Sequence, residues 1–138
     1  MYLIDSNVIS ELRKKTKMNA GVKQFFDEAN RKNSDLYLSV ITVGELYRGV
    51  GMIRHRGDEP QAKALEQWLE SLLGKYEPFI LPFDLDASQV WGKLRTPHHE
   101  NAIDKQIAAT AILYDLILIT RNTKDFSQTG ARLINPFQ

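Results

Sequence analysis

The chain has 138 residues, of which 43% are hydrophobic and 25% are charged, and its net charge is +1 at pH 7. This length and balance fit one globular domain with its own core, whereas the near-zero net charge excludes a protein that coats nucleic acid through an overall positive field. The absence of cysteine excludes disulfide scaffolds and thiolate metal sites.

The N-terminal segment carries no targeting signal that we recognise. Only three apolar residues separate Met1 from Asp5, which is too short for a signal-peptide core. No apolar stretch approaches the length that spans a bilayer. We therefore expect a cytoplasmic protein that is not associated with a membrane.

Short apolar segments alternate with helical patterns from one end of the chain to the other. Strands are predicted at residues 2–4, 36–41, 79–83, 116–120 and 132–134. Apolar residues recur at helical spacing within residues 22–29, 43–50, 65–73, 87–94 and 103–111. Strands separated by helices favour right-handed crossovers. The sequence therefore predicts an α/β fold, a single compact domain with a mostly parallel four- to five-stranded sheet and helices on both faces.

Acidic residues lie at four places where a predicted strand gives way to a helix: Asp5, Glu45, Asp104 and Asp125. In a parallel sheet these junctions face the same edge, so we expect the four carboxylates to converge. Carboxylates that are forced together repel one another, and their pKa values rise unless a cation holds them. Mg²⁺ or Mn²⁺ is the natural cation for oxygen ligands. The pattern therefore predicts a metal-dependent enzyme that acts on phosphates.

Each acid also has a purely structural interpretation, because helix starts carry the same signals. Asp5 is a good N-cap residue. The spacing of a capping box occurs three times, at Thr42 and Glu45, at Asn101 and Asp104, and at Asn122 and Asp125. Capping is the commoner role for any one such acid, whereas four acids at corresponding junctions favour metal chemistry.

The helical patterns also predict where two of the acids lie. Asp104 shares a stripe with Ala108 and Ala111, where burial of a carboxylate without a charged partner is costly. Glu45 is expected opposite the core face of its helix, where it needs no burial. Short polar residues that can bind water or a phosphate oxygen surround the acids, namely Ser6, Asn7, Thr120 and Asn122.

Five segments together resemble one known family. They are the strand and turn at residues 3–12 with Asp5-Ser6-Asn7, residues 39–46 with Glu45, residues 103–111 with Asp104, residues 120–126 with Asp125, and residues 134–137. In this order they resemble the PIN-domain ribonucleases, and among these the VapC and FitB type toxins of bacterial toxin–antitoxin operons. The resemblance covers essentially the whole chain, so we expect residues 1–138 to form a single PIN-like nuclease domain.

The resemblance implies an endoribonuclease, a hydrolase that cleaves RNA phosphodiester bonds with a water activated by Mg²⁺, for which Mn²⁺ is a plausible substitute. By that resemblance Asp5, Glu45 and Asp104 are the invariant metal-coordinating acids and Asp125 is a more variable fourth. Asp5 and Asp104 are the expected direct metal ligands, since Mg²⁺ usually binds few protein carboxylates. Two departures from the family pattern are Ser6, in place of threonine, and the loop at residues 98–100, which lacks a usual glycine.

The resemblance also implies partners, namely an RNA substrate, a cognate VapB-like antitoxin and a second copy of the chain in a homodimer. Such an antitoxin lies in a groove between helices. Residues 43–73 are expected to form a helical hairpin whose apolar residues either line this groove, form a dimer face or pack in the core, and they include Tyr47, Trp68 and Leu72.

Several alternatives remain open at this point. Asp84 and Asp86 resemble a phosphatase nucleophile motif, but too little chain follows them, and a capping box of Asp86 and Gln89 at a helix start is the favoured interpretation. Asp84 also fits the phosphoacceptor of a receiver-like Mg²⁺-binding signalling domain, although the lysine that a receiver needs is absent. A catalytically silent binding module of the same fold is a further alternative. His98 and His99 are either an acid–base pair or solvent-exposed loop residues.

Basic residues gather in two places, at Arg13, Lys14, Lys15 and Lys17 and at Arg48, Arg54, His55 and Arg56. They either follow an RNA backbone or are ordinary solvated surface charges.

Overall fold

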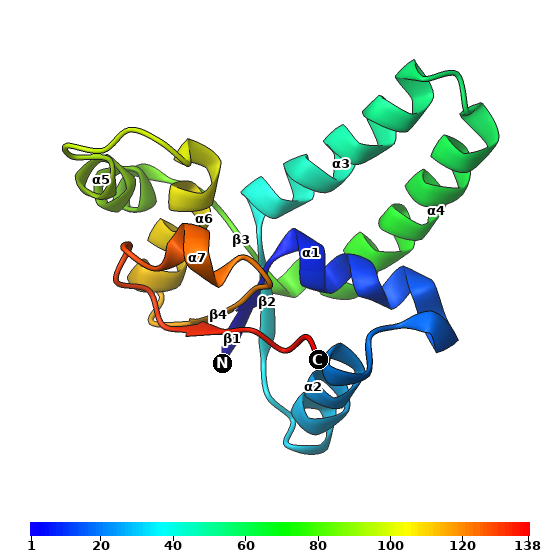
Figure 1. Ribbon diagram of the computed structural model, residues 1–138, viewed down its shortest axis with the longest axis horizontal. Helices are drawn as coiled ribbons and strands as arrows, with labels where there is room; N and C mark the ends of the chain where they lie inside the picture. Colours follow the sequence, from blue (N-terminus) through cyan, green and yellow to red (C-terminus); the bar gives the residue numbers. More distant parts are fainter.

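A five-stranded parallel sheet forms the centre of the computed structural model, which describes residues 1–138 (Figure 1). Its strands are β1 (Tyr2–Ile4), β2 (Leu36–Ser39), β3 (Ile80–Leu81), β4 (Ile117–Ile119) and β5 (Leu133–Ile134). They lie in the order β3-β2-β1-β4-β5, and every pair is parallel. The predicted α/β fold with a parallel sheet is confirmed, and β1 is its central strand.

Helices connect these strands. They are α1 (Ser6–Ile9), the 3₁₀ helix η1 (Ser10–Lys17), α2 (Ala20–Arg31), α3 (Val40–His55), α4 (Glu59–Tyr76), the 3₁₀ helix η2 (Glu77–Phe79), α5 (Leu85–Leu94), α6 (Ala102–Leu113) and α7 (Thr123–Phe126). None of them combines the length and the apolar character that a helix needs to cross a membrane.

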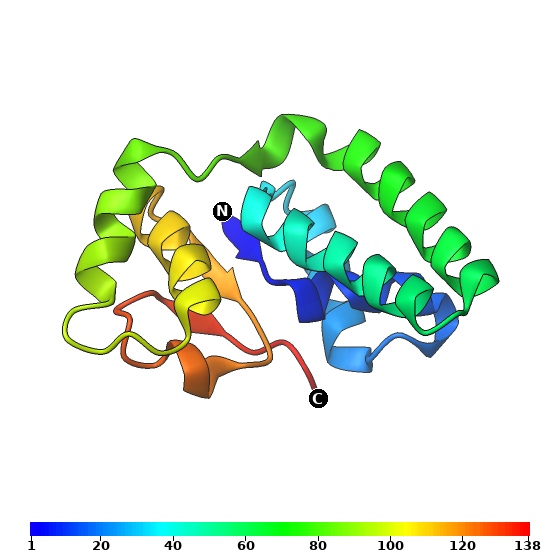
Figure 2. The same cartoon turned by 90° about the horizontal axis from the view of Figure 1, so that it is seen from above.

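Two hydrophobic cores lie on the two faces of the sheet, because successive side chains of a strand point to opposite faces. Ile4 of β1 belongs to the core that α1 to α4 cover, whereas its neighbour Leu3 belongs to the core that α6 and α7 cover. Figure 2 shows the α3–α4 hairpin and the α5–α6 pair on opposite sides of the sheet. Each fully buried leucine or isoleucine contributes about 1.5–3 kcal/mol to this packing. Helices therefore cover both faces of the sheet, and we expect a functional site at one of its edges.

The second strand ends earlier than the sequence predicts. Ser39 ends β2, and its side-chain oxygen accepts a hydrogen bond from the Ile41 N–H at 3.0 Å, so that α3 begins at Val40. The prediction that the strand reaches residue 41 is wrong, because a serine N-cap outcompetes the β propensity of the two residues that follow it. Glu45 consequently lies in the second turn of α3, not the first, and the predicted capping box of Thr42 and Glu45 does not form.

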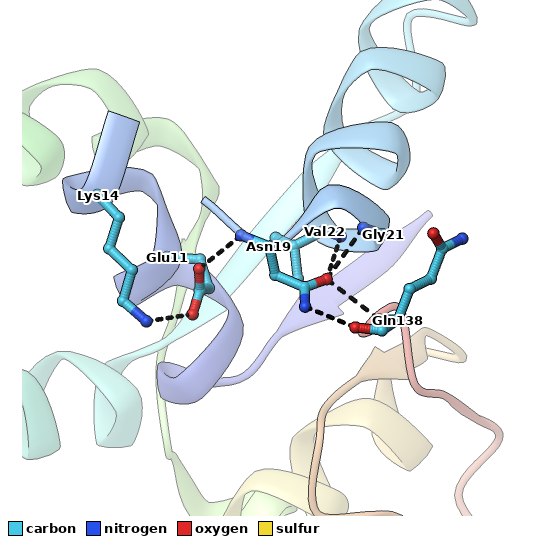
Figure 3. A network of polar contacts seen from close by, with 6 residues as sticks. All are labelled: Glu11, Lys14, Asn19, Gly21, Val22 and Gln138. Carbon is cyan, nitrogen blue, oxygen red and sulfur yellow. Dashed lines mark hydrogen bonds and ion pairs between the residues drawn. The ribbon is translucent and has the colours of Figure 1, made fainter. Parts of the chain in front are cut away.

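The last residues of the chain are held against the start of α2 (Figure 3). The side-chain oxygen of Asn19 accepts hydrogen bonds from the Gly21 N–H at 2.9 Å and from the Gln138 N–H at 3.1 Å. The Asn19 N–H in turn donates to the buried carboxylate of Glu11 at 3.0 Å. A Cβ atom at Gly21 would lie 2.1 Å from the carbonyl oxygen of Pro136, so only glycine permits this close approach. The contacts join η1, the start of α2 and the C-terminal tail to one another.

Candidate active site at the carboxyl edge of the sheet

The strand order reverses between β1 and β4, and this is the place where open α/β sheets form a crevice beyond the carboxyl ends of their strands. Asp5 directly follows β1, and Thr120 directly follows β4. The two junctions are bonded together. The Asp5 N–H donates to the Ile119 carbonyl oxygen at 3.0 Å, and the Thr120 hydroxyl donates to the Asp5 carboxylate at 2.7 Å. The Asp5 carboxylate thus lies at the switch point of the sheet, the place where the strand order reverses.

Asp5 is buried, with 3% of its surface exposed, and its carboxylate has three hydrogen-bond donors. Besides the Thr120 hydroxyl, these are the Ser6 N–H at 2.8 Å and the Asn7 side-chain amide at 3.3 Å. Burial raises the pKa of Asp5, and the three hydrogen bonds partly oppose that rise. Asp5 therefore caps α1, as the structural interpretation predicts, but the same side chain also joins two strands and is fixed in one orientation.

Glu45 projects from α3, which contacts both α1 and α6. The side chain is half-buried, and its Oε1 atom is buried without any hydrogen-bond partner. Burial, followed by the negative charges of Asp5 and Asp104, raises the pKa of Glu45 to about 7. The expectation that Glu45 needs no burial is wrong, because the early start of α3 brings its first turns against two neighbouring helices. A buried carboxylate oxygen without a donor has a desolvation cost that a bound cation would offset.

Asp104 lies in the first turn of α6, and Asp125 lies in α7. Burial, followed by the negative charges of Asp5 and Asp125, raises the pKa of Asp104 to about 6. The cap residues of these helices, Asn101 and Asn122, make no side-chain capping bond. The Asp104 and Asp125 carboxylates accept no hydrogen bond, so the capping interpretation is wrong for both pairs.

The four acids thus lie at one edge of the sheet, linked through their charges. Asp5 and Asp104 each raise the pKa of Glu45, and Asp125 raises that of Asp104. No three His, Cys, Asp or Glu side chains lie close enough together to hold a metal ion by themselves. Mg²⁺ typically keeps several waters and takes one or two carboxylates, so this looser arrangement of hard oxygen donors fits such a cation. The unpartnered Glu45 oxygen supports the fit.

The short polar residues support the acids in different ways. The side-chain oxygen of Asn7 accepts from the Arg121 N–H at 3.1 Å, which ties the loop after β4 to α1. Asn122 contributes its backbone N–H, which donates to the Thr120 hydroxyl at 3.0 Å. Asn7 and Thr120 therefore orient Asp5 directly, whereas Asn122 acts through Thr120.

Residues outside the acidic motifs also lie beside the acids. A cleft next to Glu45 contains Ser10, Arg13 and Gly49, and a polar cavity next to Asp125 contains His98 and the buried Lys105. His98 and His99 are exposed loop residues. The spacing of Ser10 and Arg13 places both on one side of a helix, but only the tertiary structure shows which helix they oppose.

Asp84, the residue of the alternative phosphate motifs, caps a helix. Its carboxylate accepts a hydrogen bond from the Ala87 N–H at 3.1 Å at the start of α5. Helix capping thus accounts for this segment, but the cap is Asp84 and not the predicted Asp86.

The raised pKa values predict how metal-free stability depends on pH. Glu45 and Asp104 titrate near pH 7 and pH 6 in the folded protein, above their ordinary values of 4.5 and 3.8. The folded state then binds more protons than the unfolded state between these limits, so these two groups make the free energy of unfolding fall as pH rises from about 4 to 7. In EDTA we expect the melting temperature of Glu45→Gln to be about 3 °C above that of the wild type at pH 8 and equal to it at pH 4. The value of about 3 °C allows for solvent screening of the half-buried Glu45 carboxylate.

Thermal unfolding of the wild type and of Glu45→Gln across this pH range measures the difference between their melting temperatures. The contributions of the other titrating groups are common to both proteins and cancel in this difference. A Glu45→Gln protein that melts below the wild type at pH 8 contradicts the repulsion inferred at this edge.

Comparison with known proteins places the whole chain in one family. The PIN domain model matches residues 2–131. The chain is 33% identical to VapC ribonuclease Y4jK of Sinorhizobium fredii, with 100% of this chain and 99% of that protein covered, and 35% identical to Toxin FitB of Neisseria gonorrhoeae, with 99% of each covered. The crystal structure of FitAcB from Neisseria gonorrhoeae superposes with a TM-score of 0.84 at 33% identity, covering 99% of this chain and 98% of that one.

Proposed function

This chain belongs to the PIN-domain family, and from that premise we propose that it is a divalent-metal-dependent endoribonuclease and the toxin of a type II toxin–antitoxin system. The names of its relatives, a VapC ribonuclease and the toxin FitB, support the activity and the biological role. The observation that carries the proposal is the group of acids at the switch point, three of which have carboxylates without hydrogen-bond donors in the protein. A structural role alone does not account for them.

The chain's own residues have distinct tasks in this proposal. Asp5, fixed by three donors, and Asp104 would hold Mg²⁺ or Mn²⁺. A cation bound there would offset negative charge on the phosphate oxygens and activate water as the nucleophile. Glu45 has a pKa of about 7 and a carboxylate oxygen without a partner, so it is suited to take a proton from that water near neutral pH. Asp125 lies beside Asp104 and would orient the water or the substrate.

We also propose a cognate VapB-like antitoxin and a homodimer as the partners of this chain. On the α3–α4 hairpin, Tyr47 and Met52 are exposed, whereas Leu72 is buried in the core. The exposed apolar residues of α3 are available to a partner. Leu72 instead packs in the core, which was one of the alternatives for the apolar residues of this hairpin.

The proposed activity is tested by incubating the purified protein with generic single-stranded RNA and Mg²⁺ or Mn²⁺. We expect internal cleavage, visible as shorter fragments after end labelling, and we expect none in EDTA. DNA of the same sequence is the matched substrate that shows whether the sugar matters.

Two results would favour the other functional classes. Labelling of Asp84 by acetyl phosphate without RNA cleavage would favour a receiver-like domain. Binding of RNA without cleavage in the presence of either metal would favour a catalytically silent module of the same fold.

A further inference from the structure

A cleft of about 230 Å³ opens directly beside Glu45. It brings together four segments, since Ser6 comes from α1, Ser10 and Arg13 from η1, Glu45 and Gly49 from α3, and its far wall from α4. The hydroxyls of Ser6 and Ser10 make no hydrogen bond within the protein, so both are free to donate to a ligand. The cleft thus joins the acidic edge of the sheet to a region with hydrogen-bond donors.

Arg13 gives this cleft a positive charge that no acid of the protein neutralises. Its neighbour Lys14 is paired with Glu11 at 2.6 Å, and Arg54 is paired with Glu59 at 2.9 Å, but Arg13 forms no ion pair. Its guanidinium instead lies 5.8 Å from the centroid of the Trp68 ring, within the range of a cation–π contact. The contact orients Arg13 and leaves its N–H groups available. A planar guanidinium held in this way suits bidentate recognition of a phosphate.

Gly49 lines the cleft, and its presence has a cost for the helix. Glycine inside a helix is about 1 kcal/mol less favourable than alanine, and Gly49 lies in the middle of α3. A Cβ atom there would meet no other atom within 4 Å, so packing within the chain does not require the glycine. Gly51 is also in α3 with open space around it, but it does not line the cleft. The two glycines therefore form a matched pair.

We propose that this cleft, which we call the Arg13 cleft, binds an RNA phosphate next to the one that is cleaved. The inference rests on the proposed ribonuclease function and assigns a substrate-binding site to it. Arg13 would contact the phosphate oxygens, with the Ser6 and Ser10 hydroxyls as further donors. The acids at the sheet edge repel the negatively charged RNA backbone. The guanidinium of Arg13, held at one side of these acids, would offset this repulsion and set the position of the RNA.

Equilibrium binding of a short single-stranded RNA tests the proposal, in an Asp104→Asn background so that the RNA stays intact. We expect Arg13→Ala to weaken binding about tenfold, because it removes a charge-assisted contact. The slope of log K against log salt should become shallower by about 0.7, the value of one phosphate contact on a single strand. In the active protein the same change should raise KM about tenfold and leave kcat within about twofold.

Lys63→Ala is the control for loss of one positive charge, since Lys63 is an exposed basic residue of α4, outside the cleft and without an ion pair. We expect no change in RNA binding or in the salt slope. If Arg13→Ala and Lys63→Ala behave alike, or if Arg13→Ala weakens only an antitoxin complex, the assignment of the Arg13 cleft to RNA is wrong. That failure is separable from failure of the proposed function, in which the wild-type protein itself cleaves no RNA.

A second pair of variants tests the cleft without touching a charge. Gly49→Leu should raise the melting temperature, since leucine favours the helix, yet weaken RNA binding at least several-fold by filling the cleft. Gly51→Leu should raise the melting temperature and leave RNA binding unchanged. If Gly49→Leu binds RNA as tightly as Gly51→Leu, the proposal is wrong, because filling the cleft then has no effect on binding. The raised melting temperature of both variants excludes unfolding as the cause of any weaker binding.

Discussion

Asp5→Asn and Asp104→Asn should each reduce RNA cleavage about a thousand-fold or more, a loss of about 4 kcal/mol of transition-state stabilisation. Each change keeps the size of the side chain but removes one of the two carboxylates proposed to hold the cation. Single-turnover cleavage of RNA with saturating Mn²⁺ measures the loss. Asp86→Asn is the matched control, because Asp86 is also a first-turn acid, in α5 and outside the group. It should retain wild-type activity.

Stability separates the two variants. The buried carboxylate of Asp5 accepts three hydrogen bonds, so Asp5→Asn should lower the free energy of unfolding by about 1–3 kcal/mol. Asp104 accepts none and is repelled by Asp5 and Asp125, so Asp104→Asn should be at least as stable as the metal-free wild type. Loss of activity in a variant that is more stable than the wild type cannot come from unfolding. Full activity of Asp104→Asn would remove this residue from the proposed site.

Removal of divalent cations should abolish cleavage altogether and at the same time destabilise the protein above neutral pH. Bound metal stabilises the folded state by about 2.7 kcal/mol at a concentration one hundred times its dissociation constant. Protons compete with the metal for Asp104, whose pKa is about 6, and protonation of Glu45, whose pKa is about 7, removes a nearby negative charge, so the stabilisation should be larger at pH 8 than at pH 5. Thermal unfolding with EDTA, and after addition of Mg²⁺ or Mn²⁺, measures both the size and the pH dependence.

The double variant with Asp5→Asn and Asp104→Asn is the control for nonspecific effects of the cation. Its melting temperature should not respond to Mn²⁺ at either pH. An equal response in the wild type and the double variant would show that the cation acts elsewhere on the protein.

The sequence predicted the architecture well because both faces of the sheet are covered. Strands that are buried on both sides are nearly continuous apolar runs, and Tyr2–Ile4 was located without error for this reason. The error at the end of β2 came from local competition, since Val40 and Ile41 favour a strand but follow a serine that caps a helix. Side-chain capping of this kind is decided by a few tenths to about 2 kcal/mol and is hard to weigh against propensity.

The candidate site was partly predictable for the same topological reason. Strand-to-helix junctions of a parallel sheet share one edge, so the approach of Asp5 and Asp104 follows from chain order alone. The burial of Glu45 was not predictable, because it depends on contacts of α3 with α1 and α6. The Arg13 cleft was not predictable either, because it requires η1 to lie opposite α3. The pattern of apolar residues within either segment does not indicate which other segment it faces.

Diffraction from crystals soaked in Mn²⁺, recorded at a wavelength where manganese scatters anomalously, is the most direct test of whether the separate acids act together on one cation. We predict an anomalous peak in contact with carboxylate oxygens of both Asp5 and Asp104, which disappears in Asp104→Asn crystals. A peak at any other place, or none at all while RNA is still cleaved, would contradict the account.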